Sequence, residues 1–109
     1  MSAINNFVFF RDQSSAGESN VFWSHSYTDG TIEIKGSATS FDVEIQGCID
    51  KESTENWITL AVVDENSLAI KTTIEDAGLY SFNAMGKGIR VKINSVSGGE
   101  LTIVGKFLN

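Results

Sequence analysis

Hydrophobic and polar residues alternate along three segments of the C-terminal half, at 78–83, 87–94 and 99–107. Polar or charged residues fill most of the positions between the apolar ones. The apolar positions that share a face are Tyr80, Phe82, Ile89, Val91, Ile93, Leu101 and Ile103. A period of two is typical of antiparallel strands with one buried and one wet face. The pattern therefore predicts three consecutive strands that end the chain as a meander.

The same period recurs nearer the N-terminus. Residues 31–36 place Ile32 and Ile34 on one face, and residues 41–49 predict a longer strand with a bulge at Gly47. Along that strand the inward residues are Phe41, Val43 and Ile45, and the outward ones are Asp42, Glu44 and Gln46. On the wet face, Glu44→Ala is expected to cost less than about 0.5 kcal/mol. Two further strands are predicted at 57–63 and 68–74, around a turn at 64–67.

The first thirty residues are less regular. An apolar run at 6–10 predicts either an internal first strand or a segment that docks on a neighbouring copy. The contact residues of the docking alternative are Phe7, Phe9 and Phe10. Residues 11–20 are rich in Ser, Gly, Gln and Asp and predict a loop. An extended aromatic segment at 21–27 and a turn at 28–30 around Gly30 are expected to follow.

These segments add up to seven or eight strands separated by short polar turns. Such spacing predicts an all-β fold, an antiparallel β-sandwich of jelly-roll type. The chain has 109 residues, 41% of them hydrophobic, which is enough for a single domain over residues 1–109 with its own core.

Charge and the N-terminal residues narrow the classes of partner. Eight Lys and Arg stand against 14 Asp and Glu, a net charge of −6, and no basic stripe is visible. A chain this acidic repels phosphate backbones, so we expect no nucleic-acid partner. The first eleven residues hold no basic n-region and an apolar run of only four. They predict neither a signal peptide nor a membrane span, and hence synthesis in the cytosol without membrane insertion.

Candidate chemistry is sparse. His25 is the only histidine and Cys48 the only cysteine, so a structural zinc site lacks its four Cys or His ligands. A triad of Ser24 or Ser26 with His25 and Asp29 is disfavoured, because neighbouring side chains of an extended segment point to opposite faces. Cys48 is expected to be a small buried residue. Acidic loops at Asp50, Glu52, Glu55 and Asp64-Glu65 favour a solvated rim over a calcium site, because no EF-hand spacing is present. The sequence thus predicts a non-enzymatic protein with no cofactor and no metal.

One aromatic segment offers a binding surface. Trp23, His25 and Tyr27 share a face of the predicted extended segment. That face either packs into the core or forms a strip that contacts a ligand or partner. Flat rings stack on pyranose faces, so Trp23 and Tyr27 would be the platforms of a carbohydrate-binding module.

A string of short motifs resembles a known family. It consists of Asp50, Asn56-Trp57, Gly78-x-Tyr80-x-Phe82, Ile89-Arg-Val91, Ser97-Gly98-Gly99 and Ile103-x-Gly105. It is similar to small β-sandwich proteins of the virion and tail regions of tailed bacteriophages and prophages of Gram-positive bacteria. The resemblance covers residues 36–107 and departs from the family at the long loop 51–55 before Trp57.

The resemblance implies a structural or adhesion part of a virion, made in the cytoplasm of the bacterial host and displayed outside. It brings no catalytic residues with it. The expected partners are other virion proteins and further copies of the chain in a homo-oligomer. In the alternative, the carbohydrate-binding module, the partner is a glycan on the host cell surface.

Overall fold

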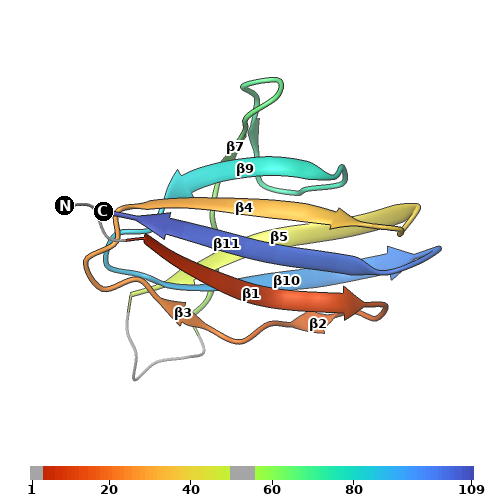
Figure 1. The fold of residues 1–109 in the computed structure, drawn as a ribbon, viewed down its shortest axis with the longest axis horizontal. Helices are drawn as coiled ribbons and strands as arrows, with labels where there is room; N and C mark the ends of the chain where they lie inside the picture. The colour runs from red at the N-terminus through yellow and green to blue at the C-terminus, as the bar shows by residue number, and fades with distance from the viewer. Residues whose placement is uncertain (1–3, 50–55) are drawn as a thin grey trace.

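A computed structural model describes residues 4–49 and 56–109, and within them every regular element is a β-strand. Two antiparallel sheets pack face to face, which confirms the predicted β-sandwich (Figure 1). The six-stranded sheet has the order β1 (Ile4–Gln13), β11 (Leu101–Leu108), β4 (Asp29–Gly36), β9 (Gly78–Asn83), β7 (Val62–Asp64), β8 (Ile70–Lys71). The five-stranded sheet has the order β2 (Gly17–Glu18), β10 (Gly88–Ser97), β5 (Ser40–Cys48), β6 (Ile58–Thr59), with β3 (Phe22–Trp23) also paired to β10. No helix in the described part is long and apolar enough to cross a membrane.

The predicted C-terminal meander is wrong. β9 and β11 both pair with β4 in the six-stranded sheet, whereas the intervening β10 pairs with β5 in the other sheet. The chain thus crosses between the layers twice in its last third. Alternation shows that a strand buries one face, but both sheets of a sandwich have such a face, so periodicity does not assign a strand to a layer.

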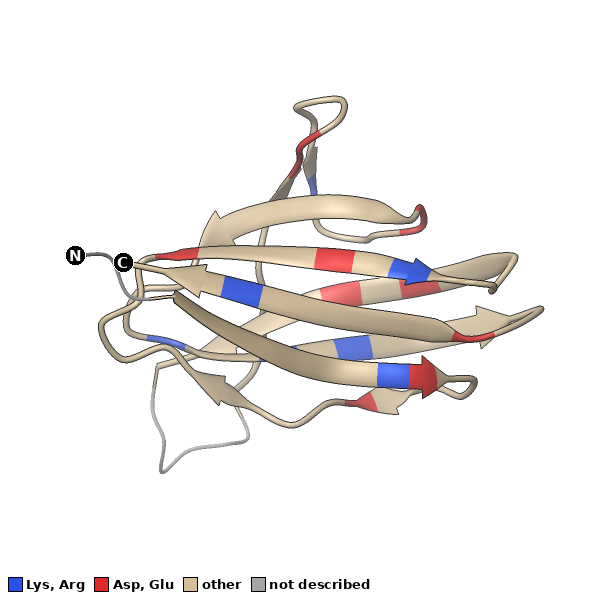
Figure 2. Cartoon of the chain, viewed as in Figure 1, with Lys and Arg blue, Asp and Glu red and all other residues tan. Residues whose placement is uncertain are grey.

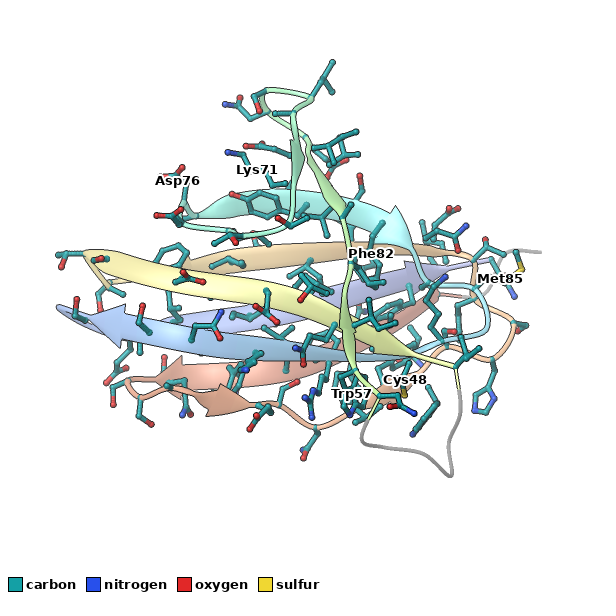
Figure 3. All side chains as sticks on the ribbon, turned by 180° about the vertical axis from the view of Figure 1, so that it is seen from behind. Cys48, Trp57, Lys71, Asp76, Phe82 and Met85 are labelled. Carbon is teal, nitrogen blue, oxygen red and sulfur yellow. The ribbon has the colours of Figure 1, made fainter. Side chains whose placement is uncertain are left out.

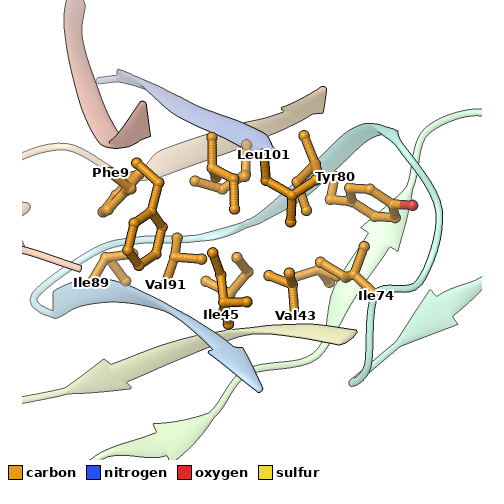
Figure 4. Close-up of a cluster of buried hydrophobic side chains, with 14 of the residues drawn as sticks. Phe9, Val43, Ile45, Ile74, Tyr80, Ile89, Val91 and Leu101 are labelled. Carbon is orange, nitrogen blue, oxygen red and sulfur yellow. The ribbon is translucent and has the colours of Figure 1, made fainter. Parts of the chain in front are cut away.

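The core lies between the sheets, where the alternating apolar positions meet (Figure 4). Val43, Ile45 and Val91 from the five-stranded sheet face Ile32, Ile34 and Ile103 from the other, and all six are at most 1% exposed. These positions confirm the inward faces that the sequence predicts. Tyr80 is buried as well, and its hydroxyl donates a 2.6 Å hydrogen bond to the Asp76 carbonyl. Burial raises the pKa of that phenol, and the nearby Asp64 and Asp76 charges add to the effect.

Aromatic rings close one end of the core. Phe22 stacks on Phe107 with ring centroids 3.9 Å apart, and Phe9 and Phe82 meet Phe107 edge-on at 6.3 and 6.2 Å. Phe9 and Phe10 are both buried, although they are consecutive residues. A register shift between Val8 and Phe10 explains this, because a bulge turns two neighbouring side chains to the same side.

The docking alternative is therefore corrected for Phe9 and Phe10. Phe9 and Phe10 lie in the core of their own chain, and Phe7 packs against that core, 4.8 Å from the ring of Phe9. The run belongs to a first strand longer than predicted, since β1 continues through Gln13 into the expected loop. The rings of Phe9 and Phe10 are covered within the chain and offer little surface to a neighbour, whereas Phe7 is half-buried and lines a hollow on the outer face of this sheet.

Four other predicted features differ in the structure: one strand start, the lengths of two segments and one bulge. β4 begins at Asp29, so the expected turn at 28–30 is partly strand. Gly30 there admits ring packing, since a Cβ would lie 2.7 Å from Phe82 Cζ. The segments 57–63 and 68–74 yield only the short strands β6, β7 and β8. The expected bulge at Gly47 is absent from the β5–β10 ladder, which shifts register between Ile93 and Ser95 instead.

Candidate functional site

The outer face of the six-stranded sheet carries a row of apolar residues where a wet face is expected. The register aligns Val8 of β1 with Val104 of β11, Val104 with Glu33 of β4, and Glu33 with Leu79 of β9. Three of these four side chains are apolar, and Val8 and Leu79 are 41% and 46% exposed. Only the strand register brings them together, because they are far apart in the sequence.

This row lies in a hollow of about 530 Å³, which we call the outer groove. Its apolar members are Phe7, Val8, Leu79 and Val104. Its other lining residues are Asn6, Thr31, Glu33, Gly105 and Lys106. Glu33 pairs with Lys35 at 3.4 Å, but both side chains are largely in solvent, so the pair adds little stability. Lys106 makes no ion pair with any residue that the structure describes. Charged residues lie on β1, β4 and β11 of this sheet, whereas β9 carries none (Figure 2).

The outer face of the five-stranded sheet is different in character, because polar side chains are bonded to one another across it. The Glu44 carboxylate accepts hydrogen bonds from Gln46 Nε2 at 2.6 Å, Thr59 Oγ1 at 2.9 Å and Asn94 Nδ2 at 3.1 Å. Partial burial by itself raises the pKa of Glu44. The three hydrogen bonds and the charge of Lys92 outweigh that effect and hold the pKa below its ordinary value.

The network continues into an aromatic contact. Arg90 Nε donates a 2.7 Å hydrogen bond to Gln46 Oε1, and its Cζ lies 4.4 Å from the centroid of the Trp57 ring. The guanidinium thus covers one face of that indole. Figure 3 shows Trp57 and Cys48 at the same end of the sandwich. Cys48 is buried, as expected, and borders a hollow of about 280 Å³ together with Ile58 and Leu60.

The structure separates the residues of the predicted aromatic strip. Trp23 lies against the backbone of β10, where a Cβ at Gly88 would be 2.6 Å from Trp23 Cζ3. His25 is exposed on a turn with φ 48° and borders a hollow of about 220 Å³ together with Trp23. Tyr27 packs against the core, 5.9 Å from the ring of Phe22. Trp23 and His25 therefore share a surface, and Tyr27 does not belong to it.

Reactive groups do not gather around these residues. Ser24 beside His25 is fully buried, and its hydroxyl accepts a 3.0 Å hydrogen bond from the Lys87 amide. Among residues 4–49 and 56–109, no three His, Cys, Asp or Glu side chains come together in a way that would hold a metal ion. Of the acidic candidates, Asp50, Glu52 and Glu55 lie outside the described residues. Asp64 accepts a 2.9 Å hydrogen bond from the Asn66 amide, which lowers the pKa of its carboxyl.

Sequence reasoning missed the outer groove. A signal was present, because Leu79 and Val104 break the alternation by placing an apolar residue at a position meant for a polar one. Each was a single exception within its own strand, and single exposed apolar residues are common. Whether such a residue belongs to a binding surface depends on which residues the strand register places beside it.

Known proteins share the sequence pattern and the fold of this chain. A family model described as XepA matches residues 3–107, and so extends past the predicted resemblance into the first strand. The prophage-derived protein YomS of the Bacillus prophage SPBc2 has a similar structure, with a TM-score of 0.90 and 18% identity over 100% of this chain and 96% of that one. The PBSX exported protein XepA, also from Bacillus, has a TM-score of 0.92 and 19% identity over 99% of this chain. The chain spans only 38% of the length of that protein. No curated protein sequence matches it significantly.

Proposed function

Because the chain belongs to the XepA family, we propose that it is a structural or adhesion module of a prophage-encoded particle. It acts through protein–protein contacts and catalyses no reaction. Its partners are other proteins of the particle and further copies of itself. It is made in the cytoplasm of the bacterial host and works outside as part of the virion. The relative XepA is described as exported, which is compatible with work outside the cell.

The outer groove is the observation that carries this proposal. Water contacts the apolar members of the groove in the isolated chain, since Val8 and Leu79 are 41% and 46% exposed. Val8 and Val104 are neighbours, and Glu33 separates them from Leu79. Exposed apolar surface bordered by polar groups marks interaction sites in soluble proteins. The nine residues that line the groove come from β1, β4, β9 and β11, so a rigid sheet presents them as a ready-made surface. Such a surface suits a module that is built into a larger assembly.

The experiment is to ask whether the chain travels with phage particles. A tagged copy is expressed in the lysogen that encodes it, the prophage is induced, and particles are purified on a density gradient. We expect the tag to band with the particles. Leu79→Asp, in the groove, should remain folded but be lost from them. Met85→Asp is the matched control, because Met85 is 55% exposed and borders none of the three hollows described above.

Two outcomes would contradict the proposal. Tagged protein found only in the soluble fraction of the lysate or medium would remove the virion role. Protein that bands with particles equally well with and without Leu79→Asp would show that the outer groove is not the contact surface. Circular dichroism of both purified variants verifies that each is folded.

A second candidate, the carbohydrate-binding module, rests on one observation. Trp23 and His25 border the same shallow hollow, which also includes Lys87. An aromatic ring and the polar groups needed to orient a sugar are therefore adjacent, although Tyr27 is not available as a second stacking ring. Titration with host cell-wall glycans tests it through Trp fluorescence. Binding that Trp23→Ala abolishes supports it, and an unchanged emission spectrum at millimolar glycan counts against it.

A further inference from the structure

The β7–β8 hairpin, residues 62–71, projects from one edge of the six-stranded sheet as an ordered unit (Figure 1). The Asp64 amide donates to the Ala69 carbonyl at 2.9 Å, and the Leu68 amide donates to the Asp64 carbonyl at 2.7 Å. The Asp64 carboxylate accepts from the Asn66 amide, and the Ser67 hydroxyl accepts from the Ala69 amide at 3.3 Å. The turn thus has a defined shape before anything binds to it.

The tip of this hairpin bears two aliphatic side chains that pack poorly against their own chain. Leu68 and Ile70 are 76% and 74% exposed, among the highest values for large apolar residues of the described chain. Leu68 also has φ 64°, in the left-handed region that Gly and Asn adopt with less strain. A leucine here gains little burial to offset its backbone strain. Its presence is explained if the side chain becomes buried against another molecule.

The outer groove is complementary to the hairpin in its apolar surface and in its unpaired charge. The groove offers Val8, Leu79 and Val104 as apolar surface. Glu33 also lines it but pairs with Lys35 at 3.4 Å, so the charge left without an ion pair among the described lining residues is the positive charge of Lys106. The hairpin offers Leu68 and Ile70, and Glu65 supplies an exposed carboxylate next to them in the turn. Neither Lys106 nor Glu65 forms an ion pair with another described residue. A hairpin seated in the groove would bury both apolar sets and bring the two opposite charges together.

We propose that the β7–β8 hairpin of one copy docks in the outer groove of a second copy. The inference rests on the proposed function, because it names the partner of the same groove. Within one chain the hairpin meets β9 only through its base, where the Glu65 amide donates to the Leu79 carbonyl at 3.0 Å. Leu68 and Ile70 stay exposed there, so the contact that buries them is made between copies. Each chain carries both halves of the contact. A closed symmetric assembly therefore fills every groove with a neighbour's hairpin and leaves no apolar surface exposed.

The test is the mass of the full chain by light scattering coupled to size exclusion, over a concentration series. Wild type is expected to form a discrete oligomer. Leu68→Asn should weaken self-association by about tenfold or more, as expected for loss of a buried apolar anchor. The dissociated variant should melt no lower than wild-type monomer, because Asn suits the left-handed position. Ile49→Asn, an equally exposed residue outside hairpin and groove, is the matched control and should leave the mass unchanged.

A charge exchange makes the contact specific. Glu65→Lys and Lys106→Glu should each weaken association, and the double variant should restore it. Three results would overturn the inference: a monomeric wild type at every concentration, an oligomer unaffected by Leu68→Asn, or a control that dissociates as much as Leu68→Asn. The chain could prove monomeric, or its oligomer could be unchanged by Leu68→Asn, while it still bands with particles in a way that Leu79→Asp abolishes. That combination would refute the hairpin contact alone. The proposed function would then stand.

Discussion

Phe107→Ala should be among the most damaging truncations in the molecule. The Phe107 side chain is fully buried, stacks on Phe22 at 3.9 Å with the rings 12° from parallel, and meets Phe9 and Phe82 edge-on. Truncation loses the transfer free energy of the ring and leaves a cavity, which together cost about 3–5 kcal/mol in well-packed cores. Because three other rings pack against this one, we expect the free energy of unfolding to fall by about 4 kcal/mol. That is a large part of the roughly 5–15 kcal/mol that holds such a domain folded.

Urea unfolding followed by far-UV circular dichroism measures this loss. The midpoint should fall with an unchanged slope, and the melting temperature should drop by roughly 15 °C or more. The measurement is repeated at two protein concentrations, so that dissociation of any oligomer is separated from unfolding. As a control, Ile49→Ala truncates a large apolar side chain at an exposed site and should cost less than about 0.5 kcal/mol. A loss below about 2 kcal/mol for Phe107→Ala, at the same slope, would refute the argument that this ring organises its end of the core.

Three further predictions use the same unfolding assay. Val91→Asp places a charge at a fully buried site opposite Ile45, and should leave no cooperative transition; a near-native midpoint would reverse the assigned face of β10. Gly105→Ala should cost about 1–3 kcal/mol, because the new Cβ would lie 2.7 Å from Phe9 Cε2; an unchanged midpoint would show that the ring can move aside. The folded-state pKa of Glu44 is lowered, so its contribution is complete above the ordinary value of 4.5 and is lost as pH falls through the folded value. The stability difference between wild type and Glu44→Gln should therefore be constant from pH 7 to about pH 5 and shrink below that, and a difference independent of pH would count against it.

Alternation predicted the buried faces of the long strands well, because side chains of a strand point to opposite sides with an invariant period. Ile32, Ile34, Val43, Ile45 and Val91 all lie where the pattern put them. It did not predict which sheet each strand joins, since the inner faces of both sheets share one composition. It overestimated the strands predicted at 57–63 and 68–74, where β6 and β8 are only two residues long and too short to show a period.

Local irregularities defeated the pattern for a different reason. The bulge after Val8 buries Phe9 and Phe10 together, and without it the run reads as apolar on both faces. Glu44 was correctly placed on the outer face, but two of its three hydrogen-bond donors, Thr59 and Asn94, come from the neighbouring strands β6 and β10. Loss of that acceptor should cost about 1–2 kcal/mol in Glu44→Ala, more than the sequence alone suggested. Strand pairing brings Thr59 and Asn94 beside Glu44, and no single segment of the sequence specifies that pairing.

The low identity to the similar structures bears on where functional information lies. Two backbones at 18% and 19% identity superpose on this one with TM-scores of 0.90 and 0.92, so the sandwich tolerates replacement of most of its side chains. What the fold requires is an alternating apolar face and a few close approaches such as Gly30 and Gly105. The outward Leu79 and the strained, exposed Leu68 meet neither requirement. Residues that the fold does not need, and that cost solubility or strain, are best explained by a contact outside the chain. The outer groove and the hairpin are therefore the places where variants should change function without changing the fold.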